Sequence, residues 1–197
     1  MKTLKVIGLI TLSLLSVANV NAQKKKKKKK AEEQVYQTPK MPVDERSKLI
    51  TYQEVVNVPG KSADEIYKEA NKWMHSYFKN ADKVIRHKDN IKKSILAKPR
   101  FRVLNPPDKN GTQLMGGIVK YTLIIEAKNG RFRYTLTNFN WKQPSYYPIE
   151  RWLDNTAPTY QKRFAYFLQQ VDKEANKTIE AMKNAIAKEK PKADDNW

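Results

Sequence analysis

The pair Asn129-Gly130 constrains the fold of this chain more than any other feature of its sequence. Asn-Gly is the preferred pair for a two-residue type I′ turn, and here it separates two runs rich in β-branched and aromatic residues, 117–128 and 131–139. We therefore expect an antiparallel hairpin whose register is fixed by the turn. Counting outward gives the pairs Lys128–Arg131, Glu126–Arg133, Ile125–Tyr134, Leu123–Leu136 and Tyr121–Asn138.

This register sorts the side chains of the hairpin into an apolar face and a basic face. The apolar face carries Tyr121, Leu123, Ile125, Ala127, Phe132, Tyr134 and Leu136. The basic face carries Lys120, Thr122, Glu126, Lys128, Arg131, Arg133, Thr135 and Thr137. A one-sided antiparallel sheet needs this division, so we expect Phe132 and Tyr134 to point into the core and Arg133 to point outward. Glu126 opposite Arg133 is a cross-strand charge pair.

A strand and a helix are expected before the hairpin. Residues 49–58 are rich in Ile, Tyr and Val and end at the turn residues Pro59-Gly60. Ser62 and Glu65 then have the spacing of a capping box, which predicts the start of a helix. Three short strands are expected at residues 83–87, 93–97 and 100–104, followed by an exposed loop at 105–111. The glycine pair Gly116-Gly117 is interpreted as easing the chain into its strand.

A long helix is expected after the hairpin. Residues 141–155 form an aromatic-rich connection with a helical turn at 149–153, and residues 158–188 show helical periodicity. Its apolar positions recur every three or four residues: Phe164, Phe167, Leu168, Val171, Ala175, Ile179, Met182 and Ile186. The predicted fold class is α+β, a single antiparallel sheet with helices packed on one face and a long C-terminal helix. This domain covers residues 49–188, and 189–197 form a polar tail.

The first 22 residues have the features of a secretory signal. Lys2 and Lys5 precede an apolar stretch that ends in small residues, so cleavage is predicted after Ala22. The chain has no cysteine, which excludes a disulfide framework, a thiolate metal site and a lipoprotein anchor. We expect an exported protein, periplasmic or secreted. The alternative is retarded export or a reversed segment, because positive charge after an apolar stretch tends to stay cytoplasmic.

The positive charge of the chain is concentrated in one run of lysines. Lys and Arg number 39 against 20 Asp and Glu, which gives a formal charge of +19. Seven of these positive charges form an unbroken run: Lys24, Lys25, Lys26, Lys27, Lys28, Lys29 and Lys30. Residues 23–48 are expected to be a disordered arm, since they hold too little apolar surface to offset chain entropy. The lysine run is either a solvated tether or a site that adheres to anionic polymer or lipid headgroups.

Two stretches of the sequence resemble a known family. They are Val-Asn-Val-Pro-Gly-Lys-Ser-Ala-Asp-Glu-Ile-Tyr at 56–67, followed by the aromatic helix, and Tyr-Thr-Leu-Ile-Ile-Glu-Ala-Lys-Asn-Gly-Arg-Phe-Arg-Tyr at 121–134. Together they resemble the exported bacterial domain of unknown function numbered 4468, which has a TATA-binding-protein-like fold. The resemblance covers roughly residues 50–140 and implies a curved antiparallel sheet with helices on one face. It implies no catalytic residue, cofactor or ligand.

The residues favour a binding role over an enzymatic one. His75 and His87 lack the spacing of metal ligands, and the sequence assembles no acid, base or nucleophile, so no catalytic residue, metal or cofactor is expected. The candidates for anion binding are the lysine run with Lys120, Lys128, Arg131 and Arg133. The expected partner is an anionic polymer, lipid headgroups or an envelope protein, not a specific nucleic acid. The alternatives are a solvated basic face, an assembly protein pairing through the long helix, and a cell-wall or sugar-acting enzyme.

Overall fold

A computed structural model describes residues 35–188. The expected signal segment 1–22, the lysine run 24–30 and the tail 189–197 lie outside the described residues. All strand pairs are antiparallel and join one sheet in the order β1-β6-β5-β3-β2, with β4 beside β5 and β7 beside β6. The elements are β1 (Tyr52–Asn57), α1 (Ala63–Tyr77), α2 (Ala81–Val84), β2 (Ile85–Asp89), β3 (Ser94–Ala97), β4 (Arg100–Leu104), β5 (Met115–Lys128), β6 (Arg131–Lys142), β7 (Tyr146–Pro148), the 3₁₀ helix η1 (Ile149–Trp152) and α3 (Arg163–Ala187).

The Asn129-Gly130 hairpin is confirmed as β5 and β6. The observed register matches the predicted one from Lys128–Arg131 to Leu123–Leu136. The predicted pair Tyr121–Asn138 is wrong, because the register shifts between Lys120 and Thr122. Asn138 has a left-handed φ of 54°, so β6 carries one extra residue there and forms a bulge. The bulge resets the alternation of β6 and turns Phe139 into the core.

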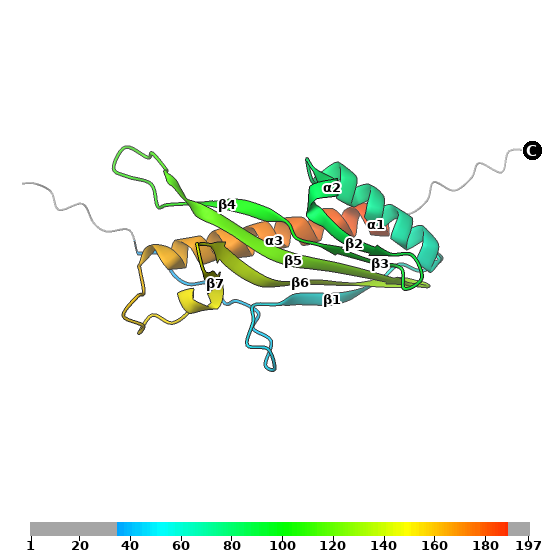
Figure 1. Ribbon diagram of the computed structural model, residues 1–197, viewed down its shortest axis with the longest axis horizontal. Coiled ribbons are helices and arrows are strands. Elements are labelled where there is room, and N and C mark those ends of the chain that lie inside the picture. Colours follow the sequence, from blue (N-terminus) through cyan, green and yellow to red (C-terminus); the bar gives the residue numbers. More distant parts are fainter. Residues whose placement is uncertain (1–34, 189–197) are drawn as a thin grey trace, which may run out of the picture. The chain divides into compact units, whose positions relative to one another are not determined.

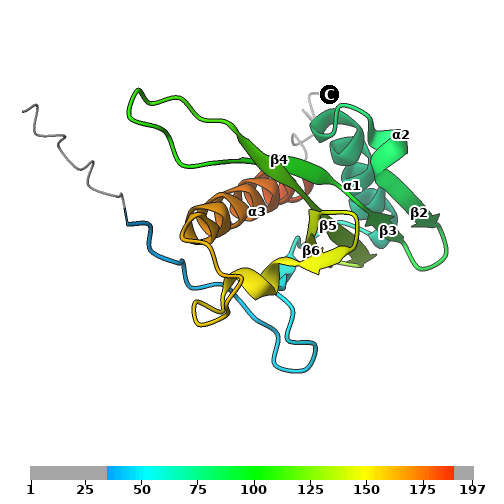
Figure 2. The same cartoon turned by 60° about the vertical axis from the view of Figure 1, so that its left-hand side comes forward.

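One face of the sheet is covered by helices. Phe132 and Tyr134 are buried, and Arg133 is exposed on the opposite face, as predicted. Figures 1 and 2 show α1 and α3 on the same side of the sheet, where α1 contacts β5, β6 and α3. The apolar stripe of α3 is buried against this sheet from Phe164 to Ile186. The predicted fold class is therefore confirmed.

The start of α1 is as predicted, but several other element boundaries differ from the predicted ones. The capping box of α1 is present, since Ser62 Oγ accepts from the N–H of Glu65 and the Glu65 carboxylate accepts from the N–H of Ser62. The strand expected at 83–87 is preceded by one turn of helix, α2, and begins at Ile85. Helix α3 begins at Arg163, five residues later than expected. Asp154 accepts from the N–H and hydroxyl of Thr156 and starts a series of turns instead.

Among the described residues, contacts with the core begin before the expected boundary at residue 49. Met41 is buried in the core, and the carbonyl of Gln37 accepts a hydrogen bond from Gln169 of α3. Tyr36 contacts Tyr166 with ring centroids 4.4 Å apart. Residues 36–41 of the expected disordered arm therefore contact the domain through Tyr36, Gln37 and Met41, whereas residues 42–48 are exposed.

The segment before β1 is held by a half-buried carboxylate. Glu150 of η1 accepts a hydrogen bond from the N–H of Ile50 at 2.7 Å, while its Oε2 atom is buried without a partner among the described residues. Burial raises the pKa of Glu150 above its ordinary value, although the Ile50 N–H acts in the opposite direction. A carboxyl group with a raised pKa in the folded state loses its stabilising contribution as the pH rises through that pKa.

The free energy of unfolding of Glu150→Gln, relative to that of the parent chain, is therefore expected to rise from pH 4 to pH 7. The rise should be less than about 1 kcal/mol, because Glu150 is half exposed. Urea unfolding at both pH values measures this change. Glu54→Gln is the matched control with the opposite sign, since hydrogen bonds from Lys183 and Tyr134 lower the pKa of Glu54. A parallel pH dependence for both variants would contradict the assignment.

Candidate anion-binding surface

The face of the sheet opposite α1 and α3 is open to solvent. We call it the open face, and the strand register defines its members. Across β1, β6 and β5 they are Gln53, Val55, Asn57, Arg131, Arg133, Thr135, Thr137, Thr122, Ile124, Glu126 and Lys128. Val55 is 50% exposed, so this face also presents apolar surface. The threonines and Gln53 supply hydrogen-bonding groups, and Thr135 donates to Gln53 at 3.0 Å.

A hollow of about 310 Å³ lies on the open face near the β5–β6 turn. Its lining residues are Val55, Glu126, Lys128, Arg131, Phe132 and Arg133. The hollow brings together three of the predicted anion-binding residues, Lys128, Arg131 and Arg133. These come from two adjacent strands because the two-residue turn places Lys128 directly opposite Arg131 and Glu126 directly opposite Arg133. We call this feature the basic hollow.

The three cations of the basic hollow differ in whether they already form an ion pair. Arg133 donates through Nε and Nη2 to the same Glu126 oxygen, at 2.8 and 2.7 Å. Lys128 and Arg131 are exposed and form no ion pair within residues 35–188. Their charges remain available to a bound anion, whereas Arg133 is held in place by Glu126. Arginine and lysine hold carboxylate and phosphate groups through charge-assisted hydrogen bonds, so the arrangement can bind either group.

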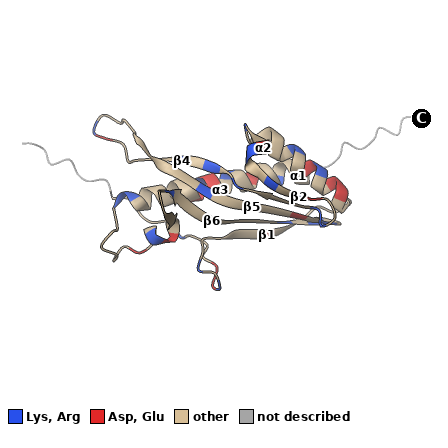
Figure 3. Ribbon diagram, in the orientation of Figure 1, with Lys and Arg blue, Asp and Glu red and all other residues tan. Residues whose placement is uncertain are grey.

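Lys120 does not belong to the basic hollow. It lies eight residues before Lys128 on β5, a separation of about 26 Å along an extended strand. Its neighbours across the strands are Arg100 of β4 and Asn140 of β6, and Figure 3 marks basic residues on both β4 and β5. The predicted basic face is thus divided into two parts. Val55 completes the hollow but was not predicted, because the pairing of β1 with β6 cannot be derived from the turn.

Other classes of site find little support in the described part of the chain. Residues 35–188 contain no group of three or more His, Asp or Glu side chains arranged to hold a metal ion. His75 and His87 are both exposed. Within the same residues, none of the helices combines the length and the apolar character that crossing a membrane requires.

The single antiparallel sheet, covered on one side by two main helices, defines a protein with a TATA-binding-protein-like (TBP-like) fold. Residues 52–142 match the sequence model of a family described as a domain of unknown function (DUF4468) with TBP-like fold. This match confirms the family resemblance drawn from residues 56–67 and 121–134. It covers the sheet from β1 to the end of β6 and leaves out α3.

Two solved structures support the same fold. A DUF4468 family protein from Bacteroides ovatus shares 17% identity with a TM-score of 0.59, over 76% of this chain and 94% of that chain. A TBP-like protein from Parabacteroides distasonis shares 17% identity with a TM-score of 0.50, over 70% of this chain and 94% of that chain. A comparison with curated proteins finds no significant match. At this identity the likeness shows the fold and assigns no function.

Proposed function

We propose that this chain is an exported, non-enzymatic binding domain that holds phosphate or carboxylate groups of an envelope component in its basic hollow. The observation that carries the proposal is the hollow itself, in which Lys128 and Arg131 stand exposed and without an ion pair among the described residues. An anionic polymer is the preferred partner, since a repeating charge can engage the hollow and the lysine run together. Lipid headgroups and an acidic envelope protein offer the same chemistry.

Export is proposed from the signal-like segment at residues 1–22, and adhesion by the lysine run from its charge. Both segments lie outside the described residues. The domain supplies a defined hollow, whereas the run supplies seven positive charges with no preference for one anion over another. We therefore assign selectivity to the hollow and general attraction to the run.

The assembly alternative is less well supported than binding. It required α3 to present an apolar stripe to a second chain, but Phe167, Val171 and Met182 are buried within the domain. The enzyme alternative needs an acid or base that is free to react. Glu126 is bound to Arg133, Asp64 to Lys93, and Glu65 caps α1, so each of these carboxylates has a structural role.

Replacing both free cations of the hollow tests the proposal. Lys128→Gln with Arg131→Gln is expected to weaken binding to polyphosphate by roughly thirtyfold, because two surface charges are lost at about 1 kcal/mol each. Polygalacturonate and phosphatidylglycerol vesicles are the other two probes, so the three distinguish a phosphate polymer, a carboxylate polymer and headgroups. Calorimetry or co-sedimentation at low and high salt supplies the affinities.

The control replaces two exposed lysines of α1 and keeps the same net charge: Lys68→Gln with Lys72→Gln. It should retain most of the affinity of the parent chain. Each pair of substitutions is also made in a chain lacking residues 24–30, so that the lysine run cannot mask the hollow. The proposal fails if that shortened chain binds all three probes equally well with and without Lys128 and Arg131.

A further inference from the structure

A second hollow lies on the helix-covered side, where the C-terminal end of α1 meets β4, β5 and α3. Its volume is about 240 Å³. Its lining residues are Tyr77, Phe78, Lys79, Arg100, Phe101, Tyr121, Glu174 and Lys177. We call it the aromatic cleft. It shares no lining residue with the basic hollow and plays no part in the function proposed above.

The aromatic rings of the cleft are held in place by packing. Tyr77 and Phe78 meet edge to face at 5.0 Å, and Phe101 meets Tyr121 in the same way at 6.1 Å. The hydroxyls of Tyr77 and the buried Thr178 lie 3.2 Å apart, which fixes the Tyr77 ring. Phe78 and Phe101 remain partly exposed. The rings of the cleft are therefore already immobilised in the folded protein, so a ligand that packs on them loses little additional side-chain entropy.

The rim of the cleft carries an excess of positive charge. Lys79, Arg100 and Lys177 are exposed and form no ion pair within the described residues. Glu174 is the one carboxylate among the lining residues. Three cations therefore surround four aromatic rings, with one negative charge to offset them. Such a rim favours an anionic group, and the ring surfaces below favour a flat apolar one.

We propose that the aromatic cleft binds a small anion built on a single ring, namely an aromatic carboxylate or an aromatic phosphate ester. The ring packs against Phe101 and Phe78, while the anionic group meets Lys177, with Lys79 and Arg100 adding positive charge to the rim. Pockets for drug-sized ligands span about 300–1,000 Å³, so a cleft of about 240 Å³ suits one ring or the ring-bearing end of a longer molecule. Neither half of the ligand alone engages both parts of the cleft.

Calorimetric titration of the full chain with phenyl phosphate and with benzoate tests this inference. Benzyl alcohol and inorganic phosphate are the probes that lack the charge or the ring. At least one of the ring anions should bind roughly tenfold more tightly than either half, which corresponds to one charge-assisted hydrogen bond of about 1.5 kcal/mol. If benzoate and phenyl phosphate bind no better than benzyl alcohol or inorganic phosphate, the inference is overturned.

Two single substitutions locate the binding. Phe101→Leu keeps an apolar side chain of similar size but removes the ring, and Lys177→Gln removes a charge at an exposed position of α3. Each should weaken the better ring anion at least fivefold while thermal unfolding shows an intact fold. Arg131→Gln, in the basic hollow, is the matched control and should leave this affinity within twofold. Equal weakening by Arg131→Gln and Lys177→Gln would place the ring anion outside the cleft and refute the assignment.

The same variants separate this inference from the function proposed above. Phe101→Leu should leave polyphosphate binding unchanged, because Phe101 does not line the basic hollow. Loss of ring-anion binding with retained polymer binding supports the cleft. If the parent chain does not bind the polymer but still binds phenyl phosphate, the proposed function is refuted and the inference about the aromatic cleft is retained.

Discussion

Gly117→Ala is expected to lower the free energy of unfolding by about 3 kcal/mol, through overpacking and a strained backbone together. Gly117 has a φ of +148°, which residues with a side chain rarely adopt, and an added Cβ would lie 2.0 Å from Nε1 of Trp141. The indole has little room to move, since it packs against Trp152 and Phe164 with centroids 5.7 and 6.2 Å away. Urea unfolding followed by tryptophan fluorescence measures the loss.

Gly111→Ala is the matched control for this prediction. Gly111 also has a positive φ, of +81°, but an added Cβ would meet nothing within 4 Å. Its cost should be about 1–2 kcal/mol, that of the left-handed backbone alone. Trp141→Leu should be less harmful in the Gly117→Ala chain than in the parent, because it removes the ring that the methyl group strikes. Equal losses for Gly117→Ala and Gly111→Ala would show that Trp141 does not crowd β5.

The contact with Trp141 gives Gly117 a role that its sequence context does not show. Gly116-Gly117 was expected to ease entry into the strand, whereas the structure places aromatic rings directly over both residues. A Cβ on Gly116 would lie 2.5 Å from the ring of Phe167, which belongs to α3. Fifty residues separate these two positions in the chain. A glycine that makes room for a distant ring cannot be distinguished by pattern from one that forms a turn.

Local chemistry explains which parts of the sheet were predictable. The Asn-Gly turn and the capping box act over two to four residues, so β5, β6 and the start of α1 follow from their own sequences. The register holds up to Thr122–Thr137 and fails at Asn138, where the bulge begins. Asparagine tolerates a left-handed φ, but it does so in turns as well. Nothing in the run Thr-Leu-Thr-Asn-Phe distinguishes a bulge from a continuous strand.

The basic hollow was predictable in part for the same reason. Lys128, Arg131 and Arg133 lie within three residues of the turn, so their grouping follows from the hairpin register alone. Lys120 lies apart from these three residues because eight residues of extended strand separate it from Lys128. The alternation of side chains shows only which face of the sheet a residue is on. Val55 joins the hollow through the pairing of β1 with β6, where Val55 lies opposite Arg133. Pairing between strands 78 residues apart depends on the whole fold and not on a local signal.

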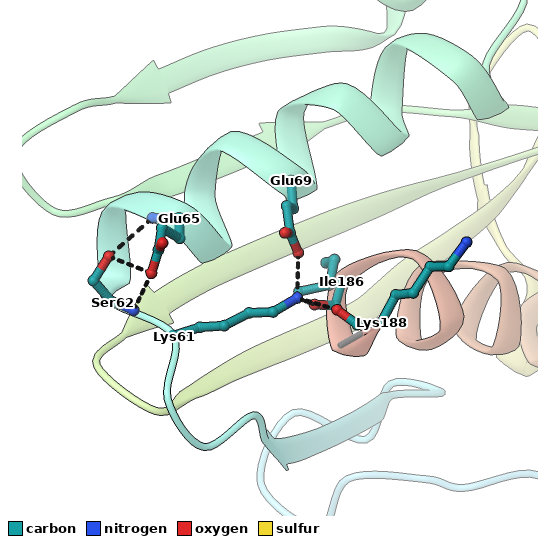
Figure 4. A network of polar contacts seen from close by, with 6 residues as sticks. All are labelled: Lys61, Ser62, Glu65, Glu69, Ile186 and Lys188. Atoms are coloured by element: carbon teal, nitrogen blue, oxygen red, sulfur yellow. Dashed lines mark hydrogen bonds and ion pairs between the residues drawn. The ribbon is translucent and has the colours of Figure 1, made fainter. Parts of the chain in front are cut away.

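Lys61 is the clearest case of a residue whose role depends on distant partners. It follows Pro59-Gly60 and is buried, with its ammonium group 2.7 Å from Glu69 and 2.6 Å from the carbonyls of Ile186 and Lys188 (Figure 4). Those carbonyls end α3, where four such groups lack partners within the helix. A cation at this end also interacts favourably with the helix dipole. Lys61 therefore joins the start of α1 to the end of α3.

Lys61→Met is expected to destabilise the fold by about 2–4 kcal/mol, because the partly buried carboxylate of Glu69 and two helix carbonyls lose their donor. Methionine keeps the length and apolar stem of the side chain, so the loss reports the ammonium group. Hydrogen exchange should also quicken in the last turn of α3 more than in its first turn. Chemical denaturation and exchange measured by mass spectrometry give the two results.

Lys93→Met is the matched control, since Lys93 forms an ion pair with Asp64 in the first turn of α1, the helix that follows Lys61. The side chain of Asp64 is 63% exposed and that of Lys93 is 27% exposed, whereas that of Lys61 is 6% exposed. An exposed pair contributes about 0–1 kcal/mol, so Lys93→Met should cost far less than Lys61→Met. Similar losses for both, with unchanged exchange at the end of α3, would mean that the ammonium group of Lys61 does not hold the two helices together. A large loss confined to Lys61→Met shows instead that one lysine after a Pro-Gly turn fixes the end of the longest helix against the first.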